Sequence, residues 1–128
     1  MLNLNLEETP NTPSVRFDVD NSRLDIEGRL LPEHPGPFFE ELREWLEAAE
    51  QQCPSCTISF YLYYYNTTST KRIVMFLEEI KRKNDAGMSV QVEWRYDEED
   101  EDAHDDAQDF IKASGLDIKL IALADEDE

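Results

Sequence analysis

Residues 57–80 read TISFYLYYYNTTSTKRIVMFLEEI, and this stretch decides how the rest of the chain is interpreted. Residues 57–65 are β-branched and aromatic with no polar face, which is the pattern of a central strand covered on both sides. From Ile73 onward, apolar residues recur at i, i+3, i+4 and i+7, which predicts an amphipathic helix. The stretch therefore predicts a buried strand that leads through a polar segment, residues 66–72, into a helix.

Periodicity on either side of this stretch predicts the remaining elements. Residues 14–28 alternate apolar and charged side chains around a turn at residues 21–22, which predicts a hairpin whose buried face includes Val19. Later segments switch between helical spacing and strand alternation. The expected order is a short edge strand or loose arm at 1–13, the hairpin at 14–28, a helix at 38–49, a strand at 57–65, a helix at 70–83, a strand at 88–96, a helix that opens at Asp97 and ends near Gly115, and a strand at 116–123.

This order predicts an α/β fold. Strands that alternate with helices near the shortest crossover length imply parallel pairing with right-handed connections, here preceded by the antiparallel hairpin. A length of 128 residues and a hydrophobic content of 40% suit one domain with a single core. We expect one domain over residues 1–128, a mixed sheet with helices packed on it, and an acidic tail at residues 124–128.

The charge of the chain restricts its partners. Thirty acidic and 12 basic residues give a net charge of −18, which argues against binding nucleic acid or an anionic membrane. No stretch approaches the roughly 20 apolar residues of a membrane span, and the N-terminus lacks the features of a signal peptide. We expect a cytoplasmic protein with no membrane insertion and with proteins or cations as partners, while self-association is left open.

Two motifs invite a chemical interpretation that their context does not favour. Cys53 and Cys56 form a CxxC, but it follows a helix and precedes a strand, the reverse of a redox motif. A zinc site needs about four ligands, and His34 and His104 are remote in sequence. The acidic run at residues 97–109 has no register that meets the glycine and glutamate positions of an EF-hand loop. With no recognisable nucleophile triad or glycine-rich phosphate loop, the sequence predicts no catalytic residue, metal site or cofactor.

The polar segment NTTSTKR, residues 66–72, is the remaining candidate site. One of its hydroxyls is expected to cap the helix, but a cap needs only one of the four. Lys71 and Arg72 are expected in the first helical turn, where the helix dipole disfavours cations. A phosphate on one of the hydroxyls would meet free backbone N–H groups and two bases. The candidate residues are Asn66, Thr67, Thr68, Ser69, Thr70, Lys71 and Arg72.

Three segments resemble the SiaC family of bacterial regulatory phosphoproteins. FDVDNSRLDIEGRLLPEHP, residues 17–35, resembles the family's opening hairpin and proline–glutamate turn. FYLYYYNTTSTK, residues 60–71, resembles its strand followed by an Asn-Thr hydroxyl stretch, and VEWRYDEEDEDAHDDAQDF, residues 92–110, resembles its Trp-x-Tyr-acidic segment. Family members often have a serine-rich sequence after Asn-Thr, and an asparagine where this chain has His34.

The resemblance implies a switch controlled by phosphorylation, without catalysis of its own and with a fold similar to that of STAS anti-anti-sigma proteins. A Ser/Thr kinase would modify the hydroxyl stretch, a PP2C-type phosphatase would remove the phosphate, and the unmodified form would bind and activate a GGDEF diguanylate cyclase. Cyclic di-GMP would then rise and favour biofilm formation. By position the acceptor falls on Thr68, with Ser69 as second choice, and physical reasoning alone does not separate them. The helix at residues 70–83 and the loop before it would form the docking surface.

Other functions stay open on the sequence alone. The runner-up is a generic STAS-like anti-anti-sigma protein that switches partners, which would use the same chemistry with a different output. A thiol-redox protein that uses Cys53 and Cys56 is a different class, and an ordinary thiol pKa near 8.5 would exclude it. A DNA mimic is a third class, which the net charge of −18 permits.

Overall fold

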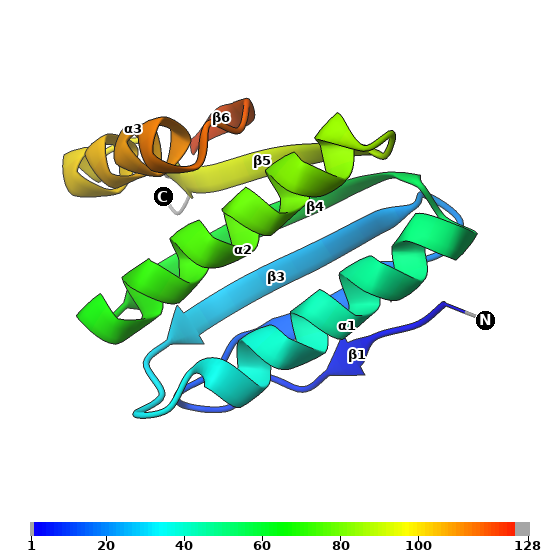
Figure 1. The fold of residues 1–128 in the computed structure, drawn as a ribbon. Coiled ribbons are helices and arrows are strands. Elements are labelled where there is room, and N and C mark those ends of the chain that lie inside the picture. Colours follow the sequence, from blue (N-terminus) through cyan, green and yellow to red (C-terminus); the bar gives the residue numbers. More distant parts are fainter. Residues whose placement is uncertain (1, 125–128) are drawn as a thin grey trace.

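A computed structural model of the chain describes residues 2–124, which form six strands and three helices (Figure 1). All six strands belong to one sheet, in the order in which they occur along the chain. The acidic tail expected at residues 124–128 lies outside the described residues except for Ala124. The elements are β1 (Asn5–Leu6), β2 (Ser14–Asp18), β3 (Arg23–Leu30), α1 (Gly36–Gln52), β4 (Ser55–Tyr65), α2 (Thr67–Asp85), β5 (Ser89–Asp97), α3 (Glu101–Ser114) and β6 (Ile118–Leu123).

The pairing of the strands confirms the predicted mixed sheet. Strands β1, β2 and β3 pair antiparallel, whereas β3, β4, β5 and β6 pair parallel. Each parallel connection contains one helix. Because sequential right-handed crossovers all turn to the same side, α1, α2 and α3 lie next to one another on a single face of the sheet (Figure 1).

The prediction that β4 is covered on both sides is therefore wrong. The helices cover only one face, and the other face of β4 carries Ser59, Tyr61 and Tyr63 among charged neighbours. Tyr61 donates a 2.7 Å hydrogen bond to the carboxylate of Asp97, and Arg95 donates one of 2.9 Å to the hydroxyl of Ser59. The tyrosine rings made this strand look apolar in the sequence, although their hydroxyl groups suit a polar surface.

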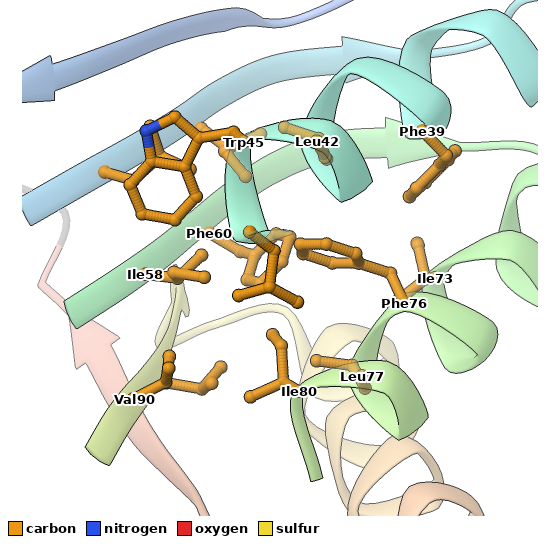
Figure 2. Close-up of a cluster of buried hydrophobic side chains, with 14 of the residues drawn as sticks. Phe39, Leu42, Trp45, Ile58, Phe60, Ile73, Phe76, Leu77, Ile80 and Val90 are labelled. Atoms are coloured by element: carbon orange, nitrogen blue, oxygen red, sulfur yellow. The ribbon is translucent and has the colours of Figure 1, made fainter. Parts of the chain in front are cut away.

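Phe60 of β4 lies at the centre of the buried cluster beneath the helices (Figure 2). Its ring stacks on Trp94 of β5 at 5.2 Å and meets Phe76 of α2 edge-on at 6.4 Å. Phe39 of α1 contacts the same Phe76 ring at 6.4 Å. Burial of each such side chain contributes about 1.5–3 kcal/mol, so this cluster fixes α1 and α2 on the sheet.

A bulge near the end of β4 determines which way its last residues face. The parallel register pairs Gly28 with Leu62 but Arg29 with Tyr64, which leaves Tyr63 as an extra residue. An extra residue reverses the alternation of side chains. The last residue of β4 therefore faces the helices, while Tyr63 and Tyr64 remain exposed.

Two local expectations differ from the structure. Strand β2 ends at Asp18, whose carboxylate accepts the backbone N–H of Asp20, so Val19 lies in the turn with 57% of its surface exposed and not in the core. Asp97 does not open a helix, because its pairing with β6 continues β5 to that residue. Helix α3 begins at Glu101 after its own capping residue.

Candidate functional site

The candidate site lies where β4 ends and α2 begins. The four parallel strands run in one direction, so the amino ends of all three helices lie at the same edge of the sheet, on the left of Figure 1. Only Asn66 separates the last residue of β4 from the first residue of α2. The polar segment is thus held between a central strand and a packed helix.

Asn66 caps α2, and no hydroxyl does, contrary to expectation. Its side-chain oxygen accepts the backbone N–H of Ser69 at 2.9 Å, and its side-chain amide donates to the carbonyl of Pro32 at 3.2 Å. Helix α2 therefore starts at Thr67, earlier than the predicted Thr70, and it ends at Asp85. The cap also ties the site to the connection between β3 and α1.

The four hydroxyls of the segment occupy different environments. Thr67 and Thr68 are exposed. Ser69 is 0% exposed, and its buried hydroxyl oxygen has no hydrogen-bond partner among residues 2–124. Thr70 donates its hydroxyl to the carbonyl of Asn66 at 3.0 Å, within the first turn. A modifying enzyme could therefore reach Thr67 and Thr68 without unfolding the helix, whereas Ser69 is inaccessible.

The two bases lie in the second turn of α2 and not in the first, because the helix starts at Thr67. The helix dipole therefore disfavours Lys71 and Arg72 less than the sequence predicted, since its effect declines beyond the first turn. Both bases are exposed, and they follow Thr68 by three and four residues. Side chains at these spacings share one helix face, so Thr68 and the two bases are neighbours.

A groove of about 390 Å³ runs between α1 and α2 beside this face. Phe39 and Phe76 contribute buried rings, and Met75 is 46% exposed. The guanidinium of Arg72 lies over Gly36, 3.5 Å from where a Cβ would be placed. The sequence did not predict this groove, although Met75 falls outside the apolar periodicity of α2 and could have indicated it. The groove is lined by Gly36, Phe39, Glu40, Arg43, Arg72, Met75, Phe76, Glu78, Glu79 and Arg82.

Tyr65 connects the site to α3. Its ring contacts Trp94 and Phe110, at 6.3 and 6.1 Å between ring centroids, and its hydroxyl donates to Asp106 at 2.7 Å. Burial, and then the hydrogen bond to Asp106, raise the pKa of Tyr65. The residue next to the cap is therefore anchored to a second helix.

The cysteines do not form a reactive pair. Both are free thiols, with Cys53 half-buried at the end of α1 and Cys56 buried in β4. Burial, and then the neighbouring Cys53, raise the pKa of Cys56 to about 11. A redox-active cysteine needs a lowered pKa, so this environment disfavours thiol chemistry.

The acidic segment and the histidines also have ordinary surroundings. His34 is exposed in the connection before α1, and the ring of His104 lies 5.7 Å from that of Tyr96. Among residues 2–124, no three His, Cys, Asp or Glu side chains are grouped so that they could hold a metal ion. No helix in that range is long and apolar enough to cross a membrane.

Comparison with known proteins points to one family. The sequence profile described as SiaC family regulatory phosphoprotein matches residues 6–123. A relative from Pseudomonas aeruginosa (strain UCBPP-PA14), described as an uncharacterized protein, is 29% identical over 112 residues, which cover 86% of this chain and 88% of the relative.

Solved structures of Pseudomonas aeruginosa proteins share the fold. The SiaC chain in the crystal structure of diguanylate cyclase SiaD with its activator SiaC matches with a TM-score of 0.83 and 24% identity, covering 94% of this chain and 99% of that one. Apo-SiaC matches with a TM-score of 0.82 and 24% identity, covering 95% of this chain and 100% of that one. The six-stranded sheet with three helices is thus a known architecture.

Proposed function

This chain belongs to the SiaC family of regulatory phosphoproteins, and we propose that it is a non-catalytic switch whose unphosphorylated form binds and activates a GGDEF diguanylate cyclase. Support comes from the solved complex in which SiaC is the activator of the diguanylate cyclase SiaD, because the SiaC chain there has the same fold. Activation would raise cyclic di-GMP and promote biofilm formation. A Ser/Thr kinase and a PP2C-type phosphatase would set the state of the switch in the cytoplasm.

Thr68 is the proposed acceptor: the resemblance to the family places it there, and its exposure beside the buried Ser69 favours it over that second choice. The kinase would transfer the terminal phosphoryl group of a nucleoside triphosphate to Oγ1 of Thr68, which forms a new O–P bond, breaks the bond between the β and γ phosphates, and releases the nucleoside diphosphate and the hydroxyl proton. Phosphatase-catalysed attack by water would break the same bond and release inorganic phosphate. Neither step requires Ser69 to leave the core.

The docking surface proposed for the cyclase is α2, with the segment before it and the adjoining groove. Thr68 lies at one end of this surface, and the partly exposed Met75 lies along it. A phosphate adds a charge of about −1.5 to −2 at neutral pH. A partner that covers Thr68 would then have to bury the added negative charge, which costs a large desolvation free energy. Modification would therefore release the cyclase.

Binding of the purified cyclase to matched variants tests this proposal. Thr68→Ala should bind like the unmodified protein, Thr68→Asp should bind at least tenfold more weakly, and Thr67→Asp should have the smaller effect. Isothermal titration calorimetry gives the affinities, and production of cyclic di-GMP gives the activation. Equal binding by Thr68→Ala and Thr68→Asp would contradict the switch, as would a kinase-dependent phosphate found only on another residue by mass spectrometry.

A further inference from the structure

The five cationic side chains of α2 fall into two groups. The three near its carboxyl end all contact carboxylates, whereas Lys71 and Arg72, near its amino end, contact none within residues 2–124. In a chain with 30 acidic and 12 basic residues, two adjacent bases without an acidic neighbour are unexpected. They are available to an anion. The paired side chains are Lys81 with Asp85, Arg82 with Glu79, and Lys83 with Glu47 and Glu50.

Arg72 differs from Lys71 because its side chain lies beside another helix, α1. Its guanidinium lies over Gly36, the first residue of α1, and it forms part of the groove between α1 and α2. The other two cations of the groove, Arg43 and Arg82, have carboxylate partners on their own helices. Arg72 is therefore the groove cation whose position no ion pair fixes within the described part of the chain.

We propose that Arg72 binds the phosphate on Thr68 within the same chain and leaves Gly36 and the groove when it does so. This inference rests on the proposed function, because it requires Thr68 to be the phosphate acceptor. The spacing of four residues places both side chains on one face of α2. A guanidinium matches phosphate oxygens with two parallel hydrogen bonds, and such charge-assisted bonds are about twice as strong as neutral ones.

The movement of Arg72 would carry the signal from α2 to α1. In the unmodified protein, Arg72 covers Gly36 and places a positive charge at the groove. After modification, the start of α1 would lose this cover, and the groove, which Glu78 also lines, would lose the positive charge of Arg72. A protein docked on the groove would thus meet a changed shape as well as a changed charge.

Nuclear magnetic resonance of the protein with phosphothreonine placed at position 68 by genetically encoded incorporation tests the movement directly. On phosphorylation, the backbone amide signal of Gly36 should shift, and the second phosphate pKa, followed by phosphorus resonance, should fall below its ordinary value of about 6. In Arg72→Gln, the Gly36 shift should disappear and the pKa should return toward 6. Lys71→Gln removes the same charge and should keep the Gly36 shift.

The outcomes separate this inference from the proposed function because the measurement needs no cyclase. A Gly36 signal that shifts equally in the parent protein and in Arg72→Gln, or a phosphate pKa that Arg72→Gln does not raise, overturns the role of Arg72 even if phosphorylation still releases the cyclase. Conversely, cyclase binding that ignores phosphothreonine at position 68 overturns the proposed function. The spectrum of each variant shows whether it is folded.

Discussion

The hydroxyl of Tyr65 donates a 2.7 Å hydrogen bond to the carboxylate of Asp106, and this bond joins the end of β4 to α3. Tyr65 is followed directly by Asn66, which caps α2 and also holds the carbonyl of Pro32. Two consecutive residues therefore attach the start of α2 to the connection before α1 and to α3. The exposed Thr68 is presented by a rigid support.

Replacement of Tyr65 by Phe should make the free energy of unfolding depend less on pH in the alkaline range. Burial and the hydrogen bond to Asp106 raise the pKa of Tyr65 in the folded state. The contribution of Tyr65 to the free energy of unfolding is therefore complete below its unfolded pKa of about 10 and is lost as pH rises above that value. Urea unfolding at several pH values should show a shallower decline for Tyr65→Phe above pH 10. The free energy of unfolding of the variant should also be about 1–2 kcal/mol lower at neutral pH, because the ring packing remains and only the hydrogen bond is removed.

Tyr64→Phe is the matched control for this titration, because Tyr64 is 63% exposed. Its unfolding free energy should follow that of the parent protein at every pH. Parallel pH curves for Tyr65→Phe and Tyr64→Phe would show that the bond to Asp106 does not hold the tyrosine in its neutral form.

Asn66→Ala should lower the free energy of unfolding by about 1–2 kcal/mol, since it removes the helix cap and the hydrogen bond to Pro32. Asn66→Asp keeps the capping oxygen and adds a negative charge that the helix dipole favours, so its free energy of unfolding should fall clearly less than that of Asn66→Ala. Urea denaturation measures both variants. If Asp is as damaging as Ala, the bond to Pro32 and not the cap accounts for the role of Asn66.

Ser69→Ala should leave the free energy of unfolding unchanged or raise it, because the buried hydroxyl of Ser69 has no hydrogen-bond partner to lose among the residues that the structure describes. Thr70→Val should cost about 0.5–1.5 kcal/mol, since the Thr70 hydroxyl donates to the carbonyl of Asn66. Thermal unfolding distinguishes the two. A clear loss in Ser69→Ala would reveal a hydrogen bond that its surroundings do not show.

The thiols should react at very different rates with a disulfide reagent at pH 8. Cys53 is partly accessible, whereas burial and Cys53 raise the pKa of Cys56 to about 11, so few Cys56 side chains are thiolates. We expect one rapid thiol in the folded protein and two after unfolding in urea. Cys53→Ser should abolish the rapid phase; if two equally fast thiols are found instead, the redox function returns to consideration.

Hydrophobic periodicity predicted the order and type of the elements, since one side of each long strand and helix contacts a single core. The face opposite the helices was missed because Tyr61 and Tyr63 count as aromatic in a pattern, whereas their hydroxyls bind Asp97 and Glu27 on an open surface. Sequence alternation reports which residues can be buried. It does not report how many layers bury them.

The candidate segment was found from its hydroxyls and bases, but its internal arrangement needed the structure. A cap by Asn66 moves the helix start, and that shift decides which hydroxyl is buried, since Ser69 then faces the core in the first turn. The guanidinium of Arg72 lies over Gly36, which is 36 positions away in the chain. No local pattern encodes such proximity.

The three helices lie side by side, and their net charges differ in sign, so the helical side of the molecule carries charge in bands. Helix α2 carries five basic and three acidic residues, a net +2, whereas α1 and α3, on either side of it, each carry one basic and five acidic residues. Among the three helices, α2 thus forms a basic band between two acidic ones. A phosphate of about −2 on α2 would cancel the net +2 of that helix, so the helical side would no longer offer an acidic partner a net positive helix.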